Sequence, residues 1–343
     1  MKTKQILLLI VLFAATVFAQ VENTQKGTPY TFSPNFFIDV ANYKGLEYGK
    51  TKVDVFLQIP YSNLKFVKNG DFFKARYSIS LTFYDEEKDN VIYEKLWNQE
   101  INANSFEEAV SKLNFKYFHQ SINLKPGKYV LRSEIIDKDS KKNGVTEAKI
   151  NVTDLLYGVN LSDIIMVSGM VNDQIVPNIA RYVTSEDTGF TFFYDVFNDT
   201  SKTINVEYIV TDKENEEIYK EKELTALGKD RVRIFKTIKK IKFSLGEYLL
   251  TVNLLDKEGN TQRSMIKKFF SRVAGFPVTI TDLDKAINQM SYIAGSGDLD
   301  FIEEGKDYQE KLTRFKAYWK AKDPTPNTEE NEVFNEYYRR VAY

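Results

Sequence analysis

Apolar and polar residues alternate along most of the chain from about residue 36. The segment 52–59, KVDVFLQI, places four apolar side chains at every second position, and 75–84, ARYSISLTFY, places five there. Successive side chains of a β-strand point to opposite faces, so this alternation predicts strands with one buried face. Asn69-Gly70 and Asn143-Gly144 follow such segments, and these residue types tolerate the backbone angles of hairpin turns, so both pairs predict turns.

One segment of the chain is repeated with a similar sequence. Residues 124–139 read LKPGKYVLRSEIIDKD and residues 243–258 read FSLGEYLLTVNLLDKE, so Gly127 matches Gly246 at an offset of 119 residues. A second pair, YDEEKDNVIYEK at 84–95 and TDKENEEIYKEK at 211–222, matches at nearly the same spacing. Several short strands and polar turns in units of about 120 residues are typical of sandwich domains. The predicted fold class is mainly β, with two tandem immunoglobulin-like or fibronectin-like β-sandwiches.

The periodicity changes to that of a helix after residue 278. A capping-box pattern at 281–284 predicts the start of a first helix, and Gly295 is expected to end it with a positive φ angle. A second helix is predicted over about 300–321, and Thr328 is expected to cap a third. The chain stops at Tyr343 inside this last pattern, which favours a truncated helical module.

The first residues differ from the rest of the chain. Two lysines precede the apolar run 6–14, ILLLIVLFA, and Val17-Phe18-Ala19 follows with small residues at its ends. This pattern predicts a secretory signal peptide cleaved after Ala19. The alternative, a membrane anchor, needs roughly 20 apolar residues and is not favoured. The predicted organisation is as follows: a signal peptide at 1–19, a flexible lead-in at 20–35, sandwiches at 36–155 and 157–275, and a helical segment at 279–343.

Composition restricts the function classes. Without residues 1–19 the chain has 45 basic and 48 acidic residues, a formal charge of −3, which gives no electrostatic signature of nucleic-acid binding. The absence of cysteine excludes disulfides, thiol nucleophiles and thiolate zinc sites. His119, the one histidine, lies in the apolar run FKYFHQSINL and is expected to be structural. No catalytic, cofactor-binding or metal-binding residues are therefore predicted, and no cofactor.

An aromatic cluster leaves two interpretations open. Its members alternate between the two faces of one predicted strand, so only a subset can share a surface. Packing in a core and between domains is favoured over a face that stacks against sugars. The residues are Phe190, Phe192, Phe193, Tyr194 and Phe197.

The C-terminal stretch FKAYWKAKDPTPNTEENEVFNEYYRRVAY, residues 315–343, resembles the opening of the domain in bacterial GWxTD-domain proteins. The segment 53–85 is similar to the N-terminal part of that family. The Gly-Trp-x-Thr-Asp motif itself is absent, because the chain ends before it would occur. The matching positions, of unknown role, are Trp319, Asp323, Pro324, Thr325, Pro326, Asn331, Glu332, Tyr338, Arg339 and Arg340.

The resemblance implies an exported bacterial cell-envelope protein and supplies no established activity. The favoured function is a non-catalytic scaffold, in which the sandwiches act as spacers or binding modules and the helical segment contacts another envelope protein. The alternatives are an accessory subunit or fragment of an envelope enzyme, whose active region would lie beyond this chain, and a glycan-binding module. Expected locations are the periplasm, the outer-membrane surface or the extracellular space. No transmembrane segment is expected after signal cleavage.

Overall fold

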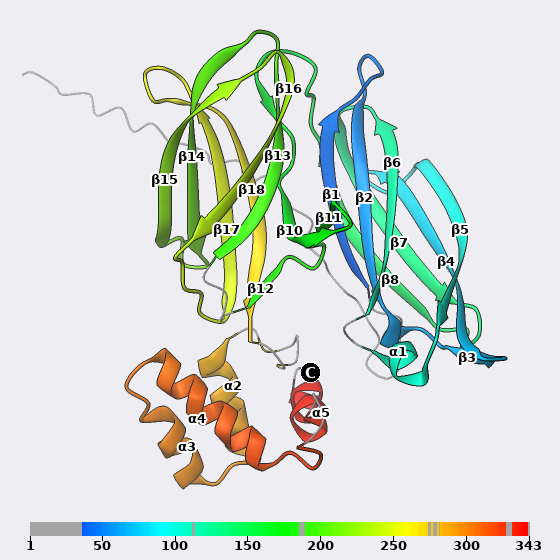
Figure 1. Ribbon diagram of the computed structural model, residues 1–343, viewed down its shortest axis with the longest axis vertical. Helices are drawn as coiled ribbons and strands as arrows, with labels where there is room; N and C mark the ends of the chain where they lie inside the picture. Colours follow the sequence, from blue (N-terminus) through cyan, green and yellow to red (C-terminus); the bar gives the residue numbers. More distant parts are fainter. Residues whose placement is uncertain are drawn as a thin grey trace, which may run out of the picture.

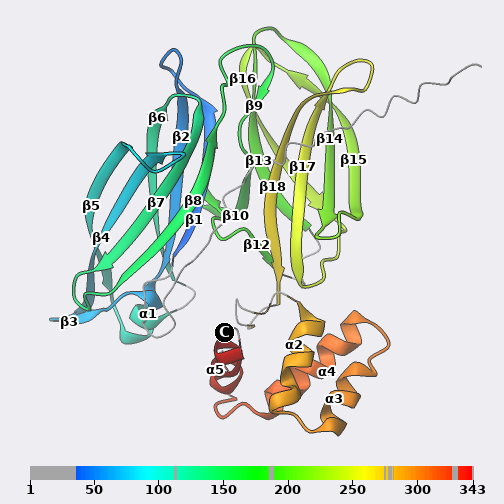
Figure 2. The ribbon, with the colours of Figure 1, turned by 180° about the vertical axis from the view of Figure 1, so that it is seen from behind.

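The computed structural model describes residues 36–111, 114–184, 189–273, 276, 280, 282–326 and 331–341. The predicted signal peptide, the lead-in and the cap at Thr328 lie outside these residues. Strands account for 55% of the chain and helices for 17%, which confirms the mainly β fold class. Figures 1 and 2 show two β-sandwiches side by side, with the helices at one end of the second. None of the helices described is both long and apolar enough to cross a bilayer.

The first sandwich packs a three-stranded sheet on a larger one around its own apolar core. The three-stranded sheet has the order β1-β2-β6, with β1 at Phe37–Lys44, β2 at Thr51–Pro60 and β6 at Phe115–Leu124. The larger sheet has the order β5-β4-β7-β8, and a short strand, β3, pairs with the start of β4. Its strands are β3 (Val67–Asn69), β4 (Phe72–Asp85), β5 (Val91–Ala103), β7 (Gly127–Asp137) and β8 (Asn143–Val152). The short helices η1 (Tyr61–Asn63) and α1 (Phe106–Val110) lie in its connections.

The second sandwich repeats this strand order. Its β10-β13-β16 sheet corresponds to β1-β2-β6, and β15-β14-β17-β18 corresponds to β5-β4-β7-β8. The first of these sheets contains β9 (Asn160–Leu161), β10 (Ile165–Val171), β11 (Gln174–Pro177), β13 (Gly189–Asn198) and β16 (Asp230–Lys239). The second contains β12 (Tyr182–Thr184), β14 (Lys202–Asp212), β15 (Glu217–Leu227), β17 (Gly246–Leu255) and β18 (Thr261–Arg272). A separate apolar core fills this sandwich.

The two predicted hairpin turns have different outcomes. Asn69-Gly70 joins β3 to β4, and Gly70 has a φ of +63°, as predicted. The prediction at Asn143-Gly144 is wrong, because both residues belong to β8 and pair with β7. The turn lies just before them, where the Asp137 carboxylate accepts hydrogen bonds from the backbone N–H groups of Asp139 and Ser140. A side chain that satisfies turn amides therefore sets this turn.

The repeated Gly-x-Tyr stretch forms the same contact in both sandwiches. The Tyr129 hydroxyl donates to the Lys125 carbonyl at 2.8 Å, and the Tyr248 hydroxyl donates to the Ser244 carbonyl at 3.0 Å. Each tyrosine lies near the start of its strand and bonds back to the loop four residues earlier. This is the tyrosine corner that fastens the loop between two sheets in immunoglobulin-like sandwiches. The repeat in the sequence thus coincides with a repeated structural contact.

Removing either corner hydroxyl is expected to destabilise the protein modestly. Tyr129→Phe and Tyr248→Phe should each lower the free energy of unfolding by about 1 kcal/mol, the usual net value of one such hydrogen bond. Urea denaturation followed by circular dichroism measures the loss. Tyr292→Phe is the control, because that side chain is 84% exposed. Equal stability of all three variants would show that the corner bonds contribute nothing.

The helical segment follows the predicted periodicity with two corrections. It contains α2 (Leu283–Gln289), η2 (Met290–Tyr292), α3 (Ser296–Glu303), α4 (Tyr308–Ala321) and α5 (Glu332–Val341). The helix predicted over about 300–321 is two helices, because Asp307 caps a new helix by accepting from the Glu310 N–H at 2.9 Å. Gly295 precedes α3 with a φ of −67° and does not adopt the positive φ that was predicted.

Candidate functional site at the junction of the sandwiches

The two sandwiches contact each other through apolar side chains. Phe193 and Phe197 on β13 point out of the second sandwich and pack in one cluster with Ala41 and Tyr43 on β1. Phe190, Phe192 and Tyr194 point the other way, into the core of the second sandwich. The aromatic strand therefore serves core and junction, as its alternation favoured, because successive strand residues face opposite sides.

Buried polar contacts fix the junction further. The Lys267 ammonium lies 2.6 and 2.7 Å from the two carboxylate oxygens of Asp39, although 228 residues separate them. Both side chains are more than nine-tenths buried. Asn42 donates its backbone N–H and its side-chain amide to one oxygen of Asp163, each at 2.7 Å. Burial lowers the pKa of Lys267 and raises the pKa of Asp163. Buried polar contacts of this kind are costly if misaligned, so they favour one orientation of the sandwiches.

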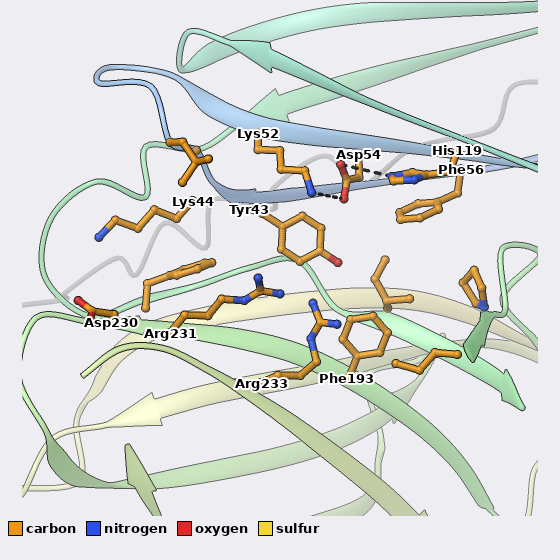
Figure 3. Close-up of a pocket in the computed structure, with 16 residues that line it drawn as sticks. Tyr43, Lys44, Lys52, Asp54, Phe56, His119, Phe193, Asp230, Arg231 and Arg233 are labelled. Carbon is orange, nitrogen blue, oxygen red and sulfur yellow. Dashed lines mark ion pairs between the residues drawn. The ribbon is translucent and has the colours of Figure 1, made fainter. Parts of the chain in front are cut away.

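A half-open cavity of about 500 Å³ lies beside these contacts, between the two sandwiches. Figure 3 shows its two walls facing each other, with Tyr43 between them. β16 and β13 supply one wall, and β2 and β6 supply the other. The strands present these side chains because each wall is the outward face of one sheet, the β1-β2-β6 sheet or the sheet that contains β13 and β16, at alternate positions.

The first wall contains two arginines that share one carboxylate. Arg233 pairs with Asp195 through its Nε at 2.8 Å and its Nη2 at 3.2 Å, and Arg231 pairs with the same carboxylate at 2.6 Å. Asp195 is fully buried. The Arg233 guanidinium lies 4.5 Å from the centre of the Phe193 ring. The hydrogen bond with Asp195 raises the pKa of Arg233, so its guanidinium is cationic at every physiological pH.

The opposite wall is nearly neutral. Asp54 receives hydrogen bonds from Ser121 at 2.5 Å and from Lys52 at 3.0 Å, and His119 lies 3.4 Å away. Burial acts to raise the pKa of the Asp54 carboxyl, but the hydrogen bonds from His119, Ser121 and Lys52 hold it below its usual value. Asp54 is therefore ionised at neutral pH and balances Lys52.

His119, which the sequence analysis expected to be structural, lies on the outward face of β6. Its side chain is about half exposed at the cavity, and its ring stacks on Phe56 with centroids 4.7 Å apart. The physical reason is strand alternation: Phe118 packs against the core of the first sandwich, so His119 faces outward. β6 therefore buries one face and leaves the other face, with His119, partly exposed.

The family-motif residues lie elsewhere, in the helical segment. Trp319 and Tyr338 are buried in its core, and Asn331 caps α5 by accepting from the Phe334 N–H at 2.9 Å. The Asn331 amide also donates to the Trp319 carbonyl at 2.6 Å. The structure therefore brings these three together by packing and capping α4 and α5.

The remaining motif residues lie around the connection to α5 and on its last turn. Thr325 donates its hydroxyl to Glu332 at 2.6 Å, and its N–H donates to Asp323 at 2.9 Å. Pro324 and Pro326 are exposed. Arg339 and Arg340 both pair with Glu336 on α5, and these hydrogen bonds lower the pKa of that carboxyl to about 2. None of these residues lines the junction cavity.

The sequence analysis named His119, Phe193 and Phe197 at this cavity but missed its charged residues. One signal was present: Asp195 is a carboxylate inside the aromatic stretch TFFYDVF, and Arg231 and Arg233 alternate in DRVRIFK. Charged side chains in a strand that otherwise packs need partners when buried. Among the residues described, no cluster of three or more histidine, aspartate or glutamate side chains could hold a metal ion.

Comparisons with known proteins add little beyond the fold. No family model and no curated protein matches the chain. Among solved structures, it is similar to red sea bream transglutaminase, at 8% identity over 68% of this chain and 31% of that one, with a TM-score of 0.22. A glycosyl hydrolase family 2 member from Bacteroides cellulosilyticus matches at 8% identity over 63% and 28%, with a TM-score of 0.27. A putative beta-galactosidase from Bacteroides fragilis matches at 11% identity over 69% and 35%, with a TM-score of 0.26. The chain thus spans about a third of the length of each of these proteins.

Proposed function

We propose that this chain is an exported, non-catalytic scaffold of the bacterial cell envelope. The observation that supports this most strongly is the junction between the sandwiches, where an apolar cluster and the Lys267–Asp39 pair join two separate cores. Domains connected only by a linker move independently, whereas buried apolar and polar contacts favour one fixed arrangement. A fixed pair of sandwiches is suited to hold other components at a set spacing.

The helical segment is attached to the scaffold in a similar way. The Leu245 N–H donates to the Tyr308 hydroxyl at 2.7 Å, and Arg272 donates to the Ile280 carbonyl at 2.8 Å. Lys213 pairs with Asp282 at 3.0 Å. Leu245 from the second sandwich also belongs to the apolar core of the helices. We propose that this segment is presented at the end of the scaffold to contact another envelope protein.

Small-angle X-ray scattering of residues 20–343 tests the scaffold proposal. The expected result is one scattering curve that fits a single arrangement of sandwiches and helices and does not change between low and high salt. A curve that requires a broad set of arrangements would contradict a fixed scaffold. Mass spectrometry of the protein exported from a bacterial host checks the proposed location, with cleavage after Ala19 as the expected product.

A further inference from the structure

The junction cavity has the dimensions of a small-ligand site. Its volume of about 500 Å³ falls in the range of pockets that enclose small molecules, and it lies between two domains, a common position for such pockets. Its walls combine apolar side chains, among them Ile165 and Phe197, with charged groups. A cavity of this size is too small for a folded partner and large enough for one or two sugar-sized units.

The arginine wall has hydrogen-bond donors to spare. A guanidinium has five N–H donors, and Asp195 engages Arg233 through Nε and Nη2 and Arg231 through Nη2. The Nη1 groups of both arginines, and Nε of Arg231, make no hydrogen bond to Asp195. Since Asp195 is a single carboxylate, the pair of arginines retains one net positive charge. Arginine is well matched in geometry to a carboxylate, which it can bind through two parallel hydrogen bonds.

The charge of the whole cavity has the same sign. Its lining includes the four cations Lys44, Lys52, Arg231 and Arg233. They face the two lining carboxylates, Asp54 and Asp230, and the buried Asp195 beneath the arginines. With His119 counted as neutral, these groups sum to one positive charge. Lys52 and Asp54 pair with each other, and Asp195 and Asp230 equal the two arginines in number, so Lys44 supplies the excess.

Other groups at the cavity are suited to ligand hydroxyls and to a sugar ring. Tyr43 is 93% buried, and no hydrogen bond joins its hydroxyl to another described residue. Figure 3 shows this hydroxyl directed into the cavity, between the arginine wall and the Asp54 wall. Asp230, beside Arg231 at the start of β16, supplies a carboxylate that can accept hydrogen bonds from ligand hydroxyls. Phe56, stacked with His119, supplies an apolar surface.

We propose that the junction cavity binds a sugar acid, with the carboxylate of the ligand on Arg231 and Arg233 and its hydroxyls towards Tyr43 and Asp230. A neutral sugar would leave the unused guanidinium donors and the excess positive charge of the cavity without an anionic partner, and a simple carboxylate would leave the Tyr43 hydroxyl without one. This inference rests on the scaffold proposed above, because the cavity exists only while the two sandwiches are held together.

The rim of the cavity indicates room for a longer ligand. The loop that brings Gly45 and Leu46 to the cavity also carries Tyr48, which is largely exposed. The hydroxyls of Tyr48 and Tyr157 lie 3.0 Å apart, and Tyr157 is also exposed. Two exposed aromatic side chains held together beside the cavity form a surface on which further sugar units of a chain can pack.

Isothermal titration calorimetry with glucuronate and galacturonate tests this inference, with glucose, galactose and acetate as comparison ligands. Binding of a uronate at least tenfold tighter than of its neutral sugar and of acetate is expected. Arg231→Gln should weaken that binding at least tenfold, as expected for loss of a charged hydrogen bond, and Tyr43→Phe about fivefold. Arg233 still pairs with Asp195 in Arg231→Gln, so thermal unfolding should be unchanged and loss of binding is not loss of fold.

Arg76→Gln is the matched control variant, because Arg76 is as exposed as Arg231 and pairs with Asp139 outside the cavity. It should bind the uronate like the natural protein.

An oligogalacturonate distinguishes two sources of the ligand. Tighter binding of the oligomer than of the monomer identifies the end of an acidic glycan, and equal binding of the two identifies a free sugar acid. Both results support the proposed chemistry. Equal binding of uronate and neutral sugar, equal binding of acetate, tighter binding of an aspartate-rich peptide, no binding, or full binding by Arg231→Gln would each overturn it. If the ligand test fails, small-angle X-ray scattering of the same sample still tests the scaffold proposal. A curve that fits one arrangement of the domains would support the scaffold even without ligand binding.

Discussion

Replacing Lys267 with alanine is expected to lower the free energy of unfolding by about 3–5 kcal/mol, the usual cost of removing one partner from a buried ion pair. The substitution would leave the Asp39 carboxylate buried with its ammonium partner gone. Most of the loss comes from that uncompensated charge, since the pair itself contributes little net stability once desolvation is subtracted. Chemical denaturation of the purified protein measures the change.

Two further variants separate this explanation from general damage to β18. Lys268→Ala, at the next position, removes a partly exposed pair with Glu247 and should cost at most about 1 kcal/mol. The double variant Asp39→Leu/Lys267→Met replaces both charges with apolar groups and should be more stable than Lys267→Ala. If Lys267→Ala were as stable as Lys268→Ala, the buried pair would not hold the junction.

Replacing Trp319 with alanine is expected to cost about 3–5 kcal/mol within the helical segment, the usual loss for a large aromatic side chain removed from a core. Trp319 is 2% exposed. Its ring lies 4.8 Å from that of Phe334 and 5.5 Å from that of Tyr338, between centroids, so it joins α4 to α5. Helices this short depend on tertiary packing for their stability. Amide hydrogen exchange of α4 and α5 should become markedly faster.

The sandwiches should stay folded in Trp319→Ala, because their cores are separate from that of the helices. The second tryptophan, Trp97, packs against the first core, and its fluorescence reports on that sandwich. Tyr292→Ala is the control, since an exposed side chain of the same segment should cost no more than about 0.5 kcal/mol. Unchanged exchange in α4 and α5 of Trp319→Ala would contradict the packing role of the tryptophan.

The sequence predicted much of the fold because the relevant signals are local. Alternation identified strands such as β2 and β4, where one face is buried by the opposite sheet. The repeated Gly-x-Tyr stretch marked the same strand in both sandwiches, β7 and β17, because each begins with the same tyrosine contact. Errors arose where a side chain decided the boundary, as at Asp307, whose cap divides a continuous helical pattern into α3 and α4.

The candidate site could not be predicted in the same way, because its residues meet only through register and domain contact. Asp195 faces Arg233 because β13 and β16 pair in one particular register. Lys267 reaches Asp39 only because the first strand of one sandwich lies against the last strand of the other. Charged residues on strands are usually solvated, so a charge within a strand pattern does not by itself indicate a buried pair. The family-motif residues near the C-terminus were the candidates that the sequence offered. The structure places three of them, Trp319, Asn331 and Tyr338, in the packing and capping of helices.

The central claim is that the two sandwiches form one fixed body, and the distance between them tests it most directly. The chain has no cysteine, so spin labels can be attached at Val91→Cys on β5 and Leu224→Cys on β15, where both side chains are exposed. Pulsed electron resonance should give a single narrow distance distribution, unchanged between low and high salt. A broad distribution, or two populations that exchange with salt, would contradict the fixed junction and with it the cavity between the sandwiches.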